Sequence, residues 1–192
     1  MNTPAHLTAS LLAWNQEEKP WVSSAIALGA FLPDLPMFAF YGIQSLVLGT
    51  SEQVIWSQVY FQENWQLFFD LFNSIPIFLL IFLLARNNRV LKLLAGSALL
   101  HLCLDLPLHH DDAHRHFLPL SHWRFMSPVS YWDPKHFGWI SAPVELIMAI
   151  GGSLYVAKKG SLAMQKLAKF NLLLYFLFLV FALVFWIPEL AR

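Results

Sequence analysis

Long apolar stretches alternate with short polar connectors along most of this chain. The clearest stretch covers residues 170–187, contains Asn171 near its start and ends at Pro188. Since a membrane-spanning helix needs about 20 mostly apolar residues, this pattern predicts a transmembrane helix. Three further apolar stretches are interrupted by a few polar residues and are candidate spans as well: residues 67–85, 90–108 and 137–157.

The first fifty residues predict two less regular features. Thr3 can cap, and Pro4 can begin, a short helix over residues 4–14 that carries His6 in its first turn. The apolar stretch 22–48 is interrupted by Pro33-Asp34-Leu35-Pro36, and a proline pair breaks the helical hydrogen-bond ladder. We therefore expect either one kinked span or a re-entrant pair of half-helices there. No basic segment precedes an apolar one, so we expect no cleaved signal peptide.

Composition supports a membrane protein and excludes other classes. Hydrophobic residues make up 57% of the 192 residues and charged residues 12%, and the formal net charge is zero. These values exclude a disordered chain and a basic nucleic-acid-binding surface. The single cysteine, Cys103, excludes a disulfide framework and a cysteine zinc site. We expect an all-α integral membrane protein with one helical domain over residues 1–192, a bundle of about four to five transmembrane helices and a short N-terminal helix.

Loop charges predict an orientation. The connectors 86–92 and 158–169 are basic, so the positive-inside rule places both in the cytoplasm. The connectors 49–66 and 109–136 then face the other side. His6 is cytoplasmic if the stretch 22–48 crosses once, and it shares the side of the second pair of connectors if that stretch is re-entrant.

Seven of the eight histidines lie between His101 and His136. His101 and Asp105 are four residues apart on a predicted helix, so imidazole and carboxylate project from one face and can bind one cation. A histidine-rich loop, residues 109–136, follows Pro107. Its first eight residues supply six more candidate groups, which are His109, His110, Asp111, Asp112, His114 and His116. Such donors suit zinc, and also manganese or iron.

The alternative to metal binding is that a histidine simply donates to a carbonyl. Ionisable groups within a span cost roughly 2.5–3.5 kcal/mol on insertion scales, which favours a functional role for the His101–Asp105 pair. Asp34 can cap the helix that begins near Pro36 or can be a ligand. Asp70 and Asn73 can form hydrogen bonds across the bundle. Glu145 is expected either to pack between helices or to support the residues that ligate the metal. Arg115 and Arg124 can bind an anionic substrate group such as phosphate, or can form surface ion pairs.

Three of these elements together resemble a known family. They are Thr3-Pro4-Ala5-His6, Gly29-Ala-Phe-Leu-Pro33-Asp34 and the pair His101 and Asp105, in this order over most of the first 135 residues. The chain resembles the membrane-bound metal-dependent hydrolases, whose members include LexA-binding inner-membrane-associated hydrolases, and which are similar in pattern to zinc-dependent phospholipase C. The resemblance implies His6, Asp34, His101 and Asp105 as metal ligands.

Two positions depart from that family. Pro36 stands where the family often has a second acid, and Asn73 stands where it has a histidine. Such a loss implies fewer metal ions, a replacement ligand from residues 109–116, or loss of hydrolysis.

Together with these residues, the resemblance implies a multi-pass hydrolase of the bacterial inner membrane. A divalent metal, zinc before manganese or iron, would activate water against a phosphoester or lipid-like substrate from the bilayer. The six loop residues would act as acid, base or second metal site, Arg115 and Arg124 would hold substrate, and no nucleic acid is expected as a partner. The alternatives are a non-enzymatic metal-binding, transport or assembly protein and, from His110, His114 and His116, a di-iron oxidase.

Overall fold

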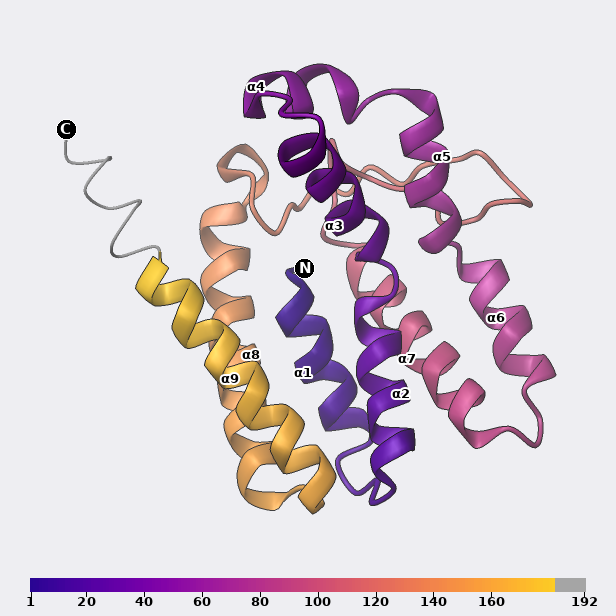
Figure 1. The fold of residues 1–192 in the computed structure, drawn as a ribbon, viewed down its shortest axis with the longest axis vertical. Helices are drawn as coiled ribbons and strands as arrows, with labels where there is room; N and C mark the ends of the chain where they lie inside the picture. The colour runs from indigo at the N-terminus through magenta and orange to yellow at the C-terminus, as the bar shows by residue number, and fades with distance from the viewer. Residues whose placement is uncertain (182–192) are drawn as a thin grey trace.

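The computed structural model describes residues 1–181, and within them the chain forms helices, turns and loops but no strand (Figure 1). The all-helical prediction is thereby confirmed for that part of the chain. The helices in order are α1 (Thr3–Ala13), α2 (Pro20–Phe31), α3 (Leu35–Gly42), η1 (Ile43–Val47), α4 (Glu52–Val54), η2 (Ile55–Val59), α5 (Glu63–Phe72), α6 (Ile75–Leu84), α7 (Arg89–Asp105), η3 (Pro134–His136), α8 (Gly138–Lys159) and α9 (Leu162–Phe181).

Prolines and short polar side chains fix where several helices begin. Pro4 lies in the first turn of α1, as predicted, but the cap is Asn2 and not Thr3. The Asn2 side chain accepts a hydrogen bond from the backbone N–H of Ala5 at 3.0 Å. The Thr3 hydroxyl does not cap the helix and instead donates a hydrogen bond to Asp34. Ser74 caps α6 in the same way that Asn2 caps α1.

Helix α1 occupies the middle of the bundle, with α2 and α7 on one side and α8 and α9 on the other (Figure 1). Its apolar side chains Leu7 and Leu11 are fully buried against Ile26 of α2, Val156 of α8 and Met164 of α9. Because α1 is surrounded on both sides, polar groups on its other faces are withdrawn from water as well. His6 is one of these groups.

The apolar stretch containing Pro33 and Pro36 is broken as predicted. Helices α2 and α3 follow one another with a bend of 65° between them, and together they meet the length and hydropathy expected of one broken span or a re-entrant loop. The bend places Asp34 at the start of α3, beside the first turn of α1.

Fewer helices qualify as membrane spans than the four to five predicted. Among the described residues two segments are long and apolar enough, Glu63–Leu84 and Gly138–Lys159, and the bent pair makes a third if it is one span. Helix α7 is short because it ends at Asp105, ahead of Pro107, after 17 residues. The predicted span 170–187 begins within α9, and its last six residues lie outside the described part.

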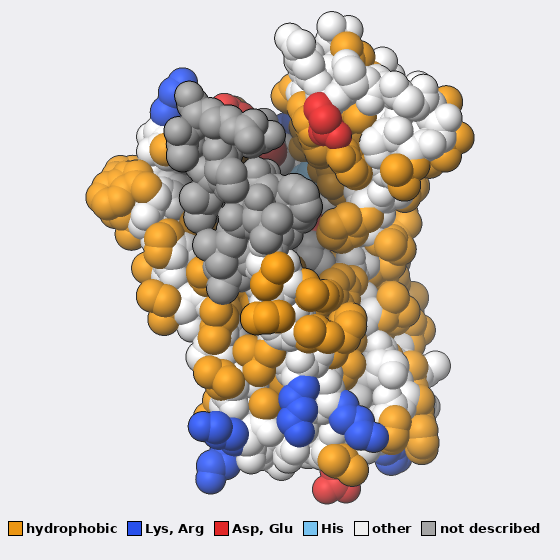
Figure 2. Space-filling model, turned by 60° about the vertical axis from the view of Figure 1, so that its left-hand side comes forward, with side chains coloured by type: hydrophobic (Ala, Val, Ile, Leu, Met, Phe, Trp, Pro, Cys, Tyr) orange, Lys and Arg blue, Asp and Glu red, His pale blue; other side chains and the backbone are white. Residues whose placement is uncertain are grey.

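Most of the lysine and arginine side chains visible in Figure 2 lie at its lower end, below a broad apolar belt. The α1–α2, α6–α7 and α8–α9 connections all lie at the lower end in Figure 1. Lys19, Arg86 and Lys159 belong to these connections or their flanks. One end of the bundle therefore carries the basic connectors, and the histidine-rich loop lies toward the opposite end.

Candidate metal centre

His6, His101 and Asp105 meet in the interior of the bundle, and all three are buried. His6 Nε2 lies 2.9 Å from Asp105 Oδ1, and His101 Nε2 lies 3.0 Å from Asp105 Oδ2. The two imidazole rings are stacked with their centroids 3.5 Å apart. One ligand atom from each of the three residues lies within 4.8 Å of the others, so the group could hold a metal ion. The prediction that His101 and Asp105 share a face of one helix is confirmed.

Close packing of α2 against α7 positions His101. Gly29 makes this possible, because a Cβ atom there would lie 2.1 Å from the carbonyl oxygen of Leu94 on α7. The next residue, Ala30, accepts a hydrogen bond from His101 Nδ1 at 2.8 Å. A histidine that ligates a metal characteristically donates its other ring N–H to a carbonyl in this way.

The bond to Ala30 assigns the protonation of His101. Since a carbonyl oxygen can only accept, Nδ1 carries a proton, and Nε2 would present a lone pair when the ring is neutral. That lone pair faces Asp105 Oδ2, and Asp34 Oδ1 lies 3.6 Å from the same nitrogen. Within residues 1–181 this buried nitrogen has no hydrogen-bond partner. The Met1 amino group lies 2.5 Å from Asp105 Oδ1 and balances part of this negative charge, and a proton on Nε2 or a metal ion between the carboxylates would balance more of it.

Asp34 lies at the edge of the cluster as a fourth potential ligand. It occupies the position before α3, but its side chain makes no capping hydrogen bond, so the cap interpretation is wrong. Its Oδ2 instead accepts a hydrogen bond from the Thr3 hydroxyl at 2.5 Å. This contact links the start of α1 to the bend between α2 and α3 and holds the carboxylate near His101.

His109 joins the cluster from the histidine-rich loop. Its Nε2 lies 3.2 Å from Asp105 Oδ1, and its Nδ1 lies 3.0 Å from Asp112 Oδ2. Burial lowers the pKa of His109, but the carboxylates of Asp105 and Asp112 outweigh it and raise that pKa to about 9. At His6 the result is opposite: burial, together with the nearby His101 and the terminal amino group, lowers the pKa to about 4 despite Asp105. Of the three imidazoles that contact Asp105, His6 is therefore hard to protonate and His109 is readily protonated.

His114 and His116 lie elsewhere. His114 Nδ1 lies 3.2 Å from Asp70 Oδ1, and His116 Nδ1 donates to the backbone oxygen of Asn73 at 2.9 Å. Burial lowers the pKa of His116 to about 4, with His114 adding to the effect. These two histidines attach the loop to α5 and do not point at Asp105.

The two arginines predicted to bind substrate are both engaged by Asp70. The fully buried Asp70 carboxylate accepts hydrogen bonds from the backbone and side chain of Arg115, and Arg124 lies 3.5 Å from it. Arg115 also pairs with Glu63 at 2.6 Å. The structure thus places Arg115 in a buried ion pair, where the sequence offered substrate binding or a surface ion pair.

His110 and Asp111 lie on the outer side of the loop. The His110 ring stacks on His136 with centroids 3.6 Å apart, and its Nδ1 donates to the backbone oxygen of Ser127. The Asp111 side chain is mostly exposed and lies 3.4 Å from His110. Of the six loop residues singled out from sequence, the structure brings His109 and Asp112 to the cluster.

Two contacts near the cluster had no clear sequence signal. Glu145 of α8 accepts hydrogen bonds from both the backbone and the side chain of Asn2, which links α8 to the start of α1. The ring of Tyr131 lies 5.0 Å from the ring of His109 and covers it from the loop side.

The N-terminal helix meets the histidine-rich loop directly. Because His6 and His109 both contact Asp105, His6 lies at the loop end of α7, away from the basic connectors. Comparison of the chain with protein-family models, with curated proteins and with solved structures gives no match. What the chain does is therefore inferred from its own residues.

Proposed function

We propose that this protein is a membrane-embedded metal-dependent hydrolase that acts on a phosphoester or lipid-like substrate, as its resemblance to the membrane-bound hydrolases suggests. The observation that carries the proposal is the buried Nε2 of His101, which makes no hydrogen bond within residues 1–181 and lies 3.0 Å from Asp105 Oδ2 and 3.6 Å from Asp34 Oδ1. Two imidazoles and one or two carboxylates match the donors of a zinc site, with manganese or iron as alternatives.

The residues present fit a catalytic ion better than a purely structural one. Structural zinc sites use four protein ligands, whereas catalytic sites commonly use three and keep one position open. His6, His101 and Asp105 form such a set, and Asp34 has a side chain 24% exposed at its edge. When bound, the ion would supply Lewis acidity and lower the pKa of a bound water from 15.7 toward about 7.

The surrounding groups have definable tasks in this scheme. The carbonyl of Ala30 holds the proton of His101 on Nδ1 and keeps Nε2 available. Thr3 holds the Asp34 carboxylate in place. His109 can donate a proton to a leaving oxygen from Nε2, while Asp112 orients its ring through Nδ1. Burial of the cluster excludes competing water and strengthens each of these interactions.

The proposed setting is the bacterial inner membrane. Helix α7 is about 26 Å long at 1.5 Å per residue, close to the roughly 30 Å of a hydrocarbon core, so we include it among four to five crossings. The basic connectors would face the cytoplasm. The metal cluster and the histidine-rich loop would lie toward the other side, within reach of a substrate that enters from the bilayer.

Metal analysis of the detergent-purified protein tests the proposal. We expect about one ion per chain in the wild type and in His122→Ala, a control histidine of the same loop, because His101, Asp105 and His6 form a single three-ligand site. His101→Ala and Asp105→Asn should lose the ion. Equal, near-zero metal in all four proteins would refute the metal site.

Hydrolysis is tested separately with bis(p-nitrophenyl) phosphate in the presence of zinc or manganese. Turnover that His101→Ala abolishes and His122→Ala retains would support the enzyme. Bound metal without turnover would refute hydrolysis of this phosphodiester and favour the alternative of a non-enzymatic metal-binding, transport or assembly protein. Because Asn73 stands where the resembled family has a histidine, metal binding without hydrolysis is a specific alternative.

A further inference from the structure

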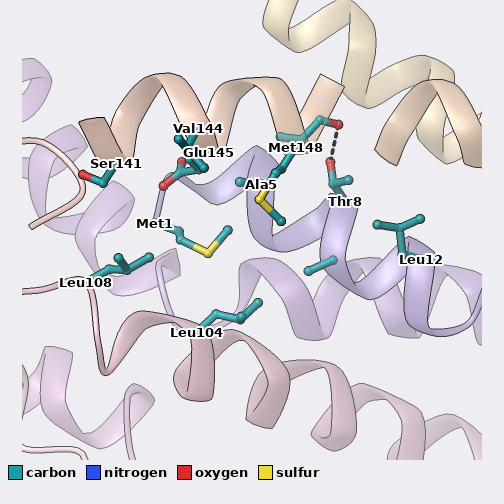
Figure 3. A pocket seen from close by; sticks show the side chains of 12 residues that line it. Met1, Ala5, Thr8, Leu12, Leu104, Leu108, Ser141, Val144, Glu145 and Met148 are labelled. Atoms are coloured by element: carbon teal, nitrogen blue, oxygen red, sulfur yellow. Dashed lines mark hydrogen bonds between the residues drawn. The ribbon is translucent and has the colours of Figure 1, made fainter. Parts of the chain in front are cut away.

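A cavity of about 310 Å³ lies between α1, α7 and α8 (Figure 3). Its walls are almost entirely apolar and include Ala5 and Ala9 of α1, Leu104 of α7, Leu108 just beyond it, and Ala149 of α8. Pockets for small ligands range from roughly 300 to 1,000 Å³, so this cavity is at the small end. It suits one slender apolar group and has few polar partners for water.

The rim of the cavity is exposed on a helix that can span a membrane. Val144 and Met148 of α8 are 50% and 69% exposed, and both line the cavity. Leu12 of α1, at the other side of the rim, is 38% exposed. Helix α8 is long and apolar enough to span a membrane, and in that setting this opening would face hydrocarbon and not water.

One end of the cavity carries a polar group with unused capacity. Glu145 lies on the α8 wall between Ser141 and Met148, near Met1 (Figure 3). It is 7% exposed and uses Oε1 for both hydrogen bonds from Asn2. Its Oε2 is buried and has no hydrogen-bond partner within the described residues. A buried carboxylate oxygen in an apolar setting is costly unless a donor reaches it.

The polar end adjoins the metal cluster. Ala5 and Leu104 line the cavity, and each precedes a cluster residue, His6 and Asp105 respectively. Met1 lines the cavity too, and its amino group lies 2.5 Å from Asp105 Oδ1. A molecule with its apolar part in the cavity would therefore have its polar part between Glu145 and the cluster.

The structure assigns a lipid site to this cavity: we infer that it binds one hydrocarbon chain of a membrane lipid, whose head group donates a hydrogen bond to Glu145 Oε2 beside the metal cluster. This inference rests on the proposed function and narrows its substrate class to lipids whose head groups carry an N–H or O–H donor. The chain enters between α1 and α8 from the bilayer, so the substrate need not cross water.

Photolabelling tests the chain site. The protein is reconstituted in phosphatidylethanolamine vesicles that contain phosphatidylethanolamine with a diazirine at the end of one acyl chain, and labelled residues are mapped after illumination. We expect label at Ala9, which lines the cavity one helical turn of α1 beyond Ala5. Met148→Trp should remove it by filling the opening, whereas Ile147→Trp should not, because Ile147 is 70% exposed on the same helix but does not line the cavity.

The head-group contact is tested with a matched pair of lipids. Phosphatidylethanolamine and phosphatidylcholine have the same net charge, but only the former has N–H donors. We expect the ethanolamine lipid to label the cavity more strongly in the wild type. Glu145→Leu should abolish the difference while leaving label from both lipids in the cavity. An equal preference in wild type and variant would overturn the role of Glu145.

The remaining outcomes separate this inference from the proposed function. Label confined to the outer face of α8, equal label in Met148→Trp and Ile147→Trp, or a cross-link to a second copy of the chain would each overturn the lipid site. His101→Ala should retain cavity label even though it loses metal. Cavity label without metal in the wild type would uphold the lipid site and reject the hydrolase, and metal with turnover but no cavity label would do the reverse.

Discussion

Gly29→Ala tests whether the contact between α2 and α7 supports the metal centre. The new Cβ would lie 2.1 Å from the Leu94 carbonyl oxygen and 2.9 Å from Ser97 Cβ. Carbon and oxygen normally approach to about 3.3 Å, so the helices must separate by roughly 1.2 Å. Both obstructing groups belong to α7, and the Leu94 oxygen is backbone, so no side-chain rotation can relieve the contact.

The expected loss of stability follows from that displacement. Overpacking a close helix contact costs typically about 1–3 kcal/mol, and replacing glycine by alanine within a helix returns up to about 1 kcal/mol. We expect a net loss of about 1–2 kcal/mol, equivalent to a fall in melting temperature of about 2–8 °C for a chain of this size. Gly42→Ala is the matched control, because a Cβ there meets nothing within 4 Å.

The same substitution should weaken metal binding. Separation of α2 from α7 lengthens the bond between Ala30 and His101 Nδ1, and loss of such a supporting contact costs about 10–100-fold in metal affinity. Thermal unfolding in detergent and metal titration by calorimetry measure the two effects. If Gly29→Ala matched Gly42→Ala in both melting temperature and affinity, the tight α2–α7 contact would not be what positions His101.

Two further predictions concern the histidine-rich loop. Asp70→Ala leaves the buried Arg115 guanidinium with the exposed Glu63 as its remaining ion-pair partner, so we expect a loss of about 3–5 kcal/mol in unfolding free energy. The double variant with Arg115→Ala should lose less than the sum of the single variants, and additive losses would contradict a coupled pair. The pKa of His116 is about 4 in the folded chain and about 6.5 in the unfolded chain, so the unfolded chain binds the proton first as the pH falls. Acidification between these two values should therefore lower the free energy of unfolding by up to about 3 kcal/mol. His116→Asn keeps a donor for the Asn73 carbonyl without titrating, and its thermal stability should fall less from pH 7 to pH 4.5; an equal fall would place the acid sensitivity elsewhere.

Local features of the fold were predictable from sequence because their causes are local. Pro33 and Pro36 interrupt the apolar stretch 22–48, as expected. The four-residue spacing of His101 and Asp105 put both on one face of α7. The capping residue of α1 was misassigned by one position, because Asn2 and Thr3 are both good caps and only the contact of Thr3 with Asp34 distinguishes them.

The partners of the loop residues depended on tertiary structure. Six polar loop residues looked equivalent in sequence, yet His109 and Asp112 reach the cluster while His114 and His116 attach to α5. Loop direction decides this, and no helical or strand periodicity constrains it. Asp70 determines the loop path through contacts that span more than forty residues.

By itself, the sequence determined a helical, strongly apolar chain with one concentrated stock of histidine and aspartate, since composition and helical spacing are properties of neighbouring residues. Tertiary structure decided that His6 reaches Asp105, which lies 99 residues away. It did so by burying the short helix α1 among α2, α7, α8 and α9, so that a histidine from a separate segment completes the candidate site. Tertiary structure also decided how many helices qualify as membrane spans and where the cavity beside Glu145 lies, because both depend on where helices end and how they pack.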